Sequence, residues 1–322
     1  MSHGLGLAPP PAAVAPDVLA TIGDTPLVEL KRLSPSPDVR VLAKLESENP
    51  TGSIKDRTAL WLIDDAERSG AIRPGDLVME PTSGNTGISM AMIARVRGYR
   101  LVAVMPENVT EERRQLLRLY GAEIVESPGE LGSNGAVAMA REISEREGIH
   151  MPFQYGNPAN PRAHYEGTAE EIVRACPEID VFVAGLGTGG TLMGASARLK
   201  EHRPDIQIIA CEPMQGDPVM GLRNLDDGFV PPILDVSRLD RKLLVGNPDA
   251  LAMTRRLASE EGIFAGVSSG AVMHVCVQVA RRMQRGTVVG IVADGGWKYL
   301  SAGLWGDDDE AVEERLDRGV FW

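Results

Sequence analysis

Short unbroken runs of apolar residues alternate along the chain with longer segments in which apolar positions recur at helical spacing. An unbroken apolar run of four to seven residues is typical of a strand buried on both faces of a parallel sheet. The pattern predicts strands at 41–45, 77–80, 101–105, 122–125, 181–184, 206–211 and 288–293. It predicts helices at 55–67, 87–97, 110–120, 136–146, 164–176, 191–201, 250–261 and 270–285, with an irregular segment at 214–235. This alternation indicates an α/β fold in which helices cover both faces of the sheet.

Charge and cysteine content exclude several function classes. The 322 residues include 33 Lys and Arg against 45 Asp and Glu, a net charge of −12, which argues against binding to nucleic acid or to anionic membranes. No stretch approaches the roughly 20 apolar residues of a membrane-spanning helix. Three widely separated cysteines exclude a disulfide framework and a zinc ribbon, and predict a reducing, cytoplasmic setting. The histidines have no metal-ligand spacing, so no metal site is expected.

Both ends differ in composition from the rest of the chain. Residues 1–16 are rich in Pro, Ala and Gly and lack the basic and apolar regions of a secretory signal, so we predict a disordered leader. Residues 305–322 form a charged tail that ends in Val-Phe-Trp, for which a helix packing its end on the body is one interpretation.

A lysine near a predicted helix start is the first candidate for chemistry. It is Lys55, in the segment NPTGSIKDR at 49–57, where Ser53 and Asp56 have the spacing of a helix-capping pair. The helix dipole lowers the pKa of an ammonium in the first turn, which favours a neutral, nucleophilic amine. The alternative from these residues alone is an ordinary surface lysine.

Two glycine-rich segments are candidate anion sites, because each follows a predicted strand and precedes a helix. They are PTSGNTG at 81–87 and GLGTGGT at 185–191. The second also matches G-x-G-x-x-G, and Glu212 ends the next strand, so a dinucleotide-binding oxidoreductase is an alternative. A third segment, GVSSGA at 266–271, brings two hydroxyls to a helix start.

Together, a reactive lysine, two anion sites and a hydroxyl turn suit pyridoxal 5′-phosphate (PLP) carrying an amino acid. In this combination the chain resembles the fold-type II PLP enzymes, specifically the cysteine synthase family. The opening IGDTPLV at 22–28 and QYGNPAN at 154–160 also resemble that family. The likeness runs from about residue 18 to about 304. It implies a tryptophan synthase β-like fold of two domains, each with a twisted, mostly parallel sheet flanked by helices.

The resemblance implies domain limits and residue roles. The large, PLP-binding domain would comprise 17–48 and 157–304, and a small mobile domain 49–156. Lys55 would bind the cofactor covalently and remove the substrate's Cα proton. Asn85 would hydrogen-bond the cofactor's ring oxygen, and Ser268 would meet its pyridine nitrogen. The residues expected to hold the phosphate are Gly187, Thr188, Gly189, Gly190 and Thr191. Those expected to bind the substrate's α-carboxylate are Thr82, Ser83, Thr86 and Gln154.

One departure from the common family pattern concerns the substrate. The segment MGLRNLDDGFVP at 220–231 is short and resembles the O-phosphoserine-dependent cysteine synthases, in which an arginine at the position of Arg223 receives the substrate phosphate. A guanidinium binds a phosphate dianion bidentately, and an acetyl ester needs no such cation. The alternative is a surface ion pair between Arg223 and Asp226 or Asp227. The segment DGGWKYLS at 294–301 also resembles this subgroup.

The function expected from this resemblance is synthesis of L-cysteine from O-phospho-L-serine and a sulfur donor through an α-aminoacrylate. The donor would be sulfide or the thiocarboxylate of a small carrier protein, and the enzyme a homodimer whose tail can cover the site. An O-acetylserine sulfhydrylase and a diaminopropionate-forming synthase that uses phosphoserine are the alternatives within the fold. The dinucleotide oxidoreductase is the alternative from another class.

Overall fold

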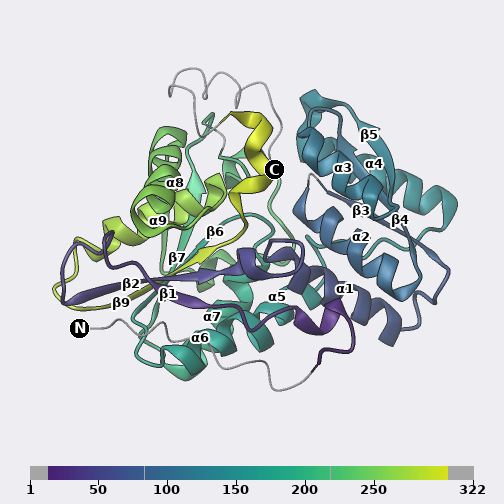
Figure 1. Ribbon diagram of the computed structural model, residues 1–322. Coiled ribbons are helices and arrows are strands. Elements are labelled where there is room, and N and C mark those ends of the chain that lie inside the picture. The colour runs from purple at the N-terminus through teal and green to yellow at the C-terminus, as the bar shows by residue number, and fades with distance from the viewer. Residues whose placement is uncertain (1–13, 83, 218, 304–322) are drawn as a thin grey trace.

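The computed structural model describes residues 14–82, 84–217 and 219–303. Two sheets with helices on their faces make up this part of the chain, which confirms the α/β class and the two-sheet architecture (Figure 1). Ser83, the tail at 305–322 and most of the predicted leader lie outside the described residues.

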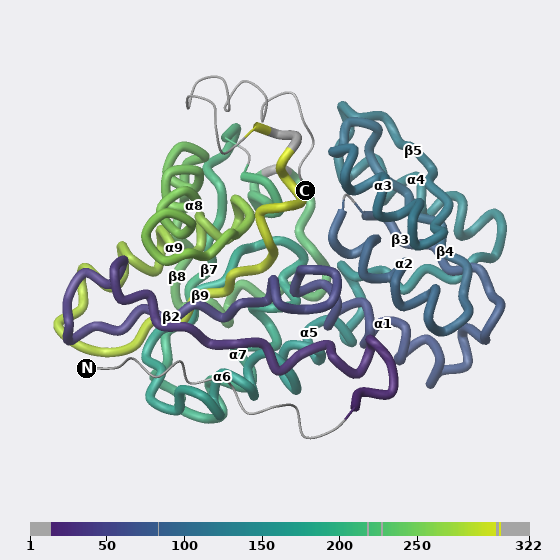
Figure 2. The backbone as a smooth tube through the Cα atoms, viewed as in Figure 1, coloured from purple at the N-terminus to yellow at the C-terminus, as the bar shows by residue number. Residues whose placement is uncertain are grey.

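The larger sheet joins the beginning, middle and end of the described chain in the order β1-β2-β9-β6-β7-β8. Its strands are β1 (Leu27–Glu29), β2 (Val39–Leu45), β6 (Val181–Gly185), β7 (Gln207–Pro213), β8 (Arg241–Val245) and β9 (Gly286–Val292). All neighbours pair in parallel except β1, which runs antiparallel to β2. Strands β2 and β9 lie side by side from Val39–Gly286 to Leu45–Val292, as Figure 2 shows, although about 240 residues separate them.

The smaller sheet is parallel throughout, in the order β3-β4-β5. Its strands are β3 (Leu77–Pro81), β4 (Arg100–Pro106) and β5 (Glu123–Ser127). All three fall within 49–156, the segment predicted to form the small domain. The domain limits and the mobility of the small domain stay predictions.

Helices fill the connections between the strands. The longer ones are α1 (Lys55–Arg68), α2 (Asn85–Arg97), α3 (Glu111–Leu119), α4 (Gly132–Glu147), α7 (Gly190–His202), α8 (Asn247–Glu261) and α9 (Val267–Ala280). Helices α5 (Ala159–Ala163) and α6 (Glu170–Ala175) flank the π-helical turn η4 (His164–Ala169). The 3-10 segments are η1 (Val18–Thr21), η2 (Glu46–Glu48), η3 (Gly129–Leu131), η5 (Leu225–Asp227), η6 (Val236–Arg238) and η7 (Gly296–Ala302).

Strand β6 shows why the strands have unbroken apolar sequences. Val181 and Val183 belong to the core that α8 and α9 form on one face, whereas Phe182 and Ala184 belong to the core with α7 on the other. Alternate side chains of a strand point to opposite faces, so a strand covered on both faces needs apolar residues at every position. The smaller sheet follows the same rule, with α1, α2 and α3 on one face and α4 on the other.

Three parts of the sequence prediction were incomplete or wrong. Strands β1 and β8 were missed because they are short and exposed at the sheet edges, where no apolar run is required. The predicted helix at 270–285 begins and ends earlier, at Val267 and Ala280. Gly270 does not delay that helix start, because it lies inside α9, where it allows close packing against Ala250 of α8. The described part of the chain contains no helix long and apolar enough to cross a membrane.

Candidate active site

A cavity opens at the carboxyl ends of β3, β6 and β9. In α/β folds this edge of the sheet is where ligands usually bind. A second hollow shares Lys55, Thr188 and Ser268 with it. Of the predicted site residues, the following line one or both: Lys55, Thr82, Asn85, Thr86, Gln154, Gly187, Thr188, Gly189, Thr191, Arg223 and Ser268.

Lys55 is the first residue of α1, and a backbone hydrogen bond to the residue after β9 holds the start of this helix in place. The amide of Ile54 donates to the carbonyl of Ala293 at 2.8 Å, so the helix start is tied to the central strand of the larger sheet. Burial lowers the pKa of the Lys55 ammonium, although the Asp294 carboxylate opposes this shift. Within the described part of the chain the Lys55 Nζ has no hydrogen-bond partner. An unpaired amine with a lowered pKa is suited to attack a carbonyl group.

The helix start predicted from Ser53 and Asp56 is confirmed, since α1 begins at Lys55 and the Ser53 hydroxyl accepts the Lys55 amide at 3.4 Å, but the Asp56 side chain does not pair with Ser53. Asp56 is fully buried, and its carboxylate accepts hydrogen bonds from the amide and hydroxyl of Thr51 and from the Ser89 hydroxyl. Asp56 therefore links the loop before α1 to helix α2, and its carboxylate makes no capping hydrogen bond with Ser53. Burial raises the pKa of Asp56 even though these hydrogen bonds favour the charged form.

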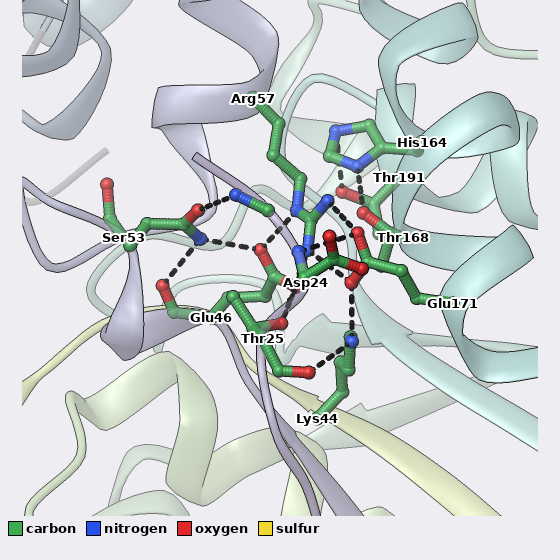
Figure 3. Close-up of polar contacts among 12 residues, drawn as sticks. Asp24, Thr25, Lys44, Glu46, Ser53, Arg57, His164, Thr168, Glu171 and Thr191 are labelled. Atoms are coloured by element: carbon green, nitrogen blue, oxygen red, sulfur yellow. Dashed lines mark hydrogen bonds and ion pairs between the residues drawn. The ribbon is translucent and has the colours of Figure 1, made fainter. Parts of the chain in front are cut away.

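A buried ion-pair cluster lies behind the start of α1 (Figure 3). Arg57, two residues beyond Lys55, donates to the carboxylates of Glu46 and Glu171. Lys44 on β2 donates to the same Glu171 and to the carbonyl of Thr25, each at 2.6 Å. The cluster ties α1, β2 and α6 together and so anchors the helix that carries Lys55.

The glycine-rich loop after β6 leads into α7 beside the cavity. Gly189 has φ = +87°, a left-handed conformation that favours glycine, and α7 begins at Gly190. Thr188 accepts a hydrogen bond from Asn160 at 3.0 Å, which fixes the loop. A helix N-terminus with exposed amides is suited to hold a phosphate. Gly190 itself does not line the cavity, because it packs against Asn160.

The dinucleotide alternative depended on Glu212, which does not line the cavity. Glu212 is buried, accepts a hydrogen bond from the amide of Leu225 at 2.6 Å and pairs with Lys242 at 3.0 Å. Its carboxylate therefore supports the loop after β7 and is not available to bind a ribose.

The predicted carboxylate-binding loop surrounds the start of α2, apart from Ser83, which is not described. Thr82 accepts from the amides of Gly84 and Gly87, and the Thr86 hydroxyl donates to Gln154 Oε1 at 2.7 Å. Gln154 is held in turn by Glu80 on β3, which accepts its backbone amide at 2.9 Å. Burial raises the pKa of Glu80 to about 8.

Ser268 and Asn85 face the cavity from two other elements. Ser268 lies in the first turn of α9, and its hydroxyl has no hydrogen-bond partner within the residues described here. Asn85 opens α2 and has two partners, Asp294 and Lys298. Sequence reasoning missed the wall that Arg113, Tyr155, Asp294 and Tyr299 contribute to the cavity. The segments at 294–301 and 154–160, which contain Asp294, Tyr299 and Tyr155, were noted for their resemblance, but nothing in the sequence signalled Arg113.

Arg223 lines the same cavity as the start of α2 and is only 6% exposed. Its amide donates to Leu186 at 2.7 Å, and its guanidinium lies over the rings of Phe229 and Tyr155, with centroid distances of 4.8 and 5.6 Å. The side chain also donates to Asn134 Oδ1 at 3.2 Å. Across the described residues it has no ion pair with a carboxylate, and burial argues against the predicted surface pair.

Comparison with known proteins assigns the family. Residues 18–294 match the family model described as pyridoxal-phosphate dependent enzyme. The cysteine synthase of Staphylococcus aureus is 43% identical over 304 residues, which cover 91% of this chain and 98% of the relative. A crystal structure of O-ureido-L-serine synthase is 40% identical with a TM-score of 0.87, over 93% of this chain and 99% of its own. The cysteine synthase of Entamoeba histolytica is 32% identical with a TM-score of 0.88, over 97% and 98%.

The chain therefore belongs to the fold-type II family of pyridoxal-phosphate-dependent enzymes. Within that family it is an enzyme of the cysteine synthase type. PLP is accordingly its cofactor, and the dinucleotide alternative is wrong.

The residues at the cavity fit this cofactor. Lys55 offers an unpaired amine, the loop before α7 offers backbone amides to a phosphate, and Ser268 offers an unpaired hydroxyl. When bound, PLP supplies an electron sink that makes the Cα–H bond of an attached amino acid acidic.

Proposed function

We propose that the chain is a cysteine synthase that uses O-phospho-L-serine, replacing the phosphate of this substrate with sulfur. In the net reaction the Cβ–O bond breaks, inorganic phosphate leaves, and hydrogen sulfide supplies the sulfur of a new Cβ–S bond. The observation that carries the proposal is Arg223, a buried cation at the cavity with no carboxylate partner among the residues described.

Burial makes a guanidinium without a carboxylate partner costly, because it has lost water and gained an amide oxygen, two aromatic faces and a side-chain hydrogen bond with the neutral Tyr155. An anionic ligand that pairs with the Arg223 guanidinium would offset that cost. A phosphate dianion suits the planar fork of Arg223, since it accepts two parallel hydrogen bonds and carries two negative charges. An acetyl group carries no charge and would leave the cation unpaired.

Other residues of the same cavity suit the amino-acid end of the substrate. The start of α2 and the side chains of Thr82, Thr86 and Gln154 offer hydrogen bonds to an α-carboxylate. We propose that Lys55 holds PLP covalently in the resting enzyme and that its amine removes the Cα proton of the bound substrate. Asn85, Ser268 and the loop before α7 would hold the ring and phosphate of PLP in the orientation that this proton transfer needs.

Kinetic comparison of two donors tests the proposal. Cysteine and released phosphate or acetate are measured with sulfide and either O-phospho-L-serine or O-acetyl-L-serine. We expect phosphoserine to be preferred, and Arg223→Met to lower kcat/KM for phosphoserine by roughly 10- to 100-fold, the value of a charge-assisted hydrogen-bonded pair. The variant's kcat/KM for acetylserine should stay within about threefold of the parent's, because that donor makes no ion pair.

Arg141→Met is the matched control. Arg141 also lies over an aromatic ring, that of Phe153 at 4.6 Å, but it is exposed on α4 and does not line the cavity. A parent enzyme that prefers acetylserine, or an Arg223→Met variant that loses both donors equally, would contradict the proposal. Supplying ammonium together with sulfide distinguishes a cysteine synthase from the diaminopropionate-forming synthase, the remaining alternative. That enzyme would make the diamine instead of cysteine.

The remaining expectations concern partners. We expect a homodimer, a location in the cytoplasm, and sulfide or a carrier-protein thiocarboxylate as the sulfur source. The cytoplasmic location is expected from the three widely separated cysteines, and the homodimer and the sulfur source are expected from the family resemblance. No contact in the described chain bears on these expectations.

A further inference from the structure

A second buried lysine lies next to the cavity without lining it. Lys298, in η7, is 0% exposed, and its Nζ donates to Asn85 Oδ1 at 2.8 Å. The ammonium also lies over the ring of Trp297, 5.1 Å from its centroid. The site as proposed above gives Lys298 no role, although a buried charge is costly unless it serves structure or function.

The carboxylate of Asp294 occupies the other side of the Asn85 amide. Asn85 Nδ2 donates to Asp294 Oδ2 at 2.7 Å, and the Tyr299 hydroxyl donates to the same oxygen at 2.5 Å. Asp294 is 1% exposed and lies two residues after the end of β9, so its position is set by the central strands.

The donor on one side and the acceptor on the other allow only one orientation of the Asn85 side-chain amide. An ammonium can only donate, so the Asn85 atom that meets Lys298 must be the oxygen. An ionised carboxylate can only accept, so the atom that meets Asp294 must be the nitrogen. Nδ2 has two hydrogens and Asp294 takes one of them, which leaves the second available to a ligand in the cavity.

We propose that Lys298 is a positioning residue that holds Asn85 with its amide nitrogen, rather than its oxygen, available to the cofactor. The inference rests on the proposed contact of Asn85 with the PLP ring oxygen, but not on the choice of donor substrate. With the amide reversed, its carbonyl oxygen would face the ring oxygen and repel it. Lys298 acts through Asn85, since its own side chain does not reach the cavity.

The surrounding charges keep Lys298 protonated near neutral pH. Burial lowers its pKa to about 8, while the carboxylates of Asp294 and Asp56 oppose this shift and Arg113 and Lys55 add to it. At pH 7 the donor-only ammonium therefore predominates, so measurements at that pH examine the state that fixes the amide.

A double-mutant cycle at pH 7 tests the proposal on cofactor binding. The four proteins are the parent, Lys298→Met, Asn85→Ala and the double variant, each prepared as holoenzyme. The readouts are the dissociation constant of PLP and the position of the bound cofactor's absorbance maximum. We expect Lys298→Met to weaken PLP binding by roughly tenfold and to shift the maximum, because a hydrogen bond that involves a charged group is lost. In the Asn85→Ala background the same substitution should change the dissociation constant less than about twofold.

Two further variants separate positioning from a general loss of structure. Lys298→Arg retains a donor-only cation and should restore the parent's absorbance maximum. Lys44→Met removes another fully buried lysine, one that pairs with Glu171 away from the cavity, and should lower thermal stability without moving that maximum. If Lys298→Met does not fold, Lys298→Gln takes its place in the cycle.

Equal effects of the Lys298 substitution in both backgrounds, or no effect on PLP at all, would overturn the proposal. Neither readout involves a donor substrate, so this outcome is independent of the Arg223 experiment. Failure of the phosphoserine assignment would leave the cycle unchanged.

Discussion

Neutralising Glu171 tests whether the ion-pair cluster behind Lys55 stabilises the fold. One oxygen of Glu171 accepts from Arg57 at 2.6 Å, and the other accepts from Lys44 at 2.6 Å and from Arg57 at 2.7 Å. The side chains of Lys44, Glu46, Arg57 and Glu171 are each at least 91% buried, and their charges sum to zero. Glu171→Gln would leave a net positive charge and turn an NH2 group toward one of the cationic donors.

The expected cost is about 3 kcal/mol. Breaking a buried ion pair typically costs about 3–5 kcal/mol, and the lower end applies because Arg57 keeps its two hydrogen bonds to Glu46. For a protein of this size that loss corresponds to a fall of roughly 5–10 °C in the thermal midpoint. Urea and thermal denaturation of the variant and parent at pH 7 measure it.

The pH dependence of protein stability independently tests whether the ionised form of Glu171 stabilises the fold. Burial raises the pKa of Glu171, but the hydrogen bonds and charges of Arg57 and Lys44 outweigh burial and bring it down to about 2, from an ordinary value of 4.5. In the window between these values the unfolded chain binds more protons than the folded one, so this stabilising contribution is lost as the pH falls from 4.5 toward 2. The stability difference between parent and Glu171→Gln should therefore narrow over that window.

Glu123→Gln is the matched control, since Glu123 pairs with Arg100 at 2.8 Å but both side chains are about 60% exposed. Its cost should stay below about 0.5 kcal/mol. If Glu171→Gln destabilised the protein no more than Glu123→Gln did, the cluster would not anchor α1 as argued.

Two further predictions concern the glycine loop and the thiols. Gly190→Ala should lower stability by about 1–3 kcal/mol and weaken PLP retention, because its Cβ would overlap Asn160, which holds Thr188; unchanged denaturation and cofactor absorbance would contradict this. All three cysteines are buried, and burial raises the pKa of Cys176 to about 12 and also raises the pKa values of Cys211 and Cys276. Thiol titration should therefore find no fast-reacting group in the native protein and three after unfolding.

Elements buried on both faces could be predicted from the sequence, and exposed edge elements could not. Strand β6 has an unbroken apolar sequence because two layers of helices cover it, so its position could be predicted from that local run of apolar residues. Strands β1 and β8 have mostly exposed or half-exposed positions, and their pairing depends on neighbours distant in the chain. No helix was predicted in the Pro- and Asn-rich passage at 157–162, yet α5 begins at Ala159, whose amide donates to the Asn157 side chain at 2.8 Å.

The sequence by itself determined the α/β class, and its short motifs pointed to Lys55, Ser268 and the loop at 187–191 as one site. Such motifs are local, since a glycine turn or a helix start is built from residues adjacent in the chain. Only the tertiary structure decided which partners meet there. The contact between Asn85 and Lys298 spans 213 residues, and Arg223 packs against the ring of Tyr155 from a distant segment as well as that of Phe229 from its own. Contacts of this kind arise from packing of the sheets and helices, which no local pattern of residues encodes.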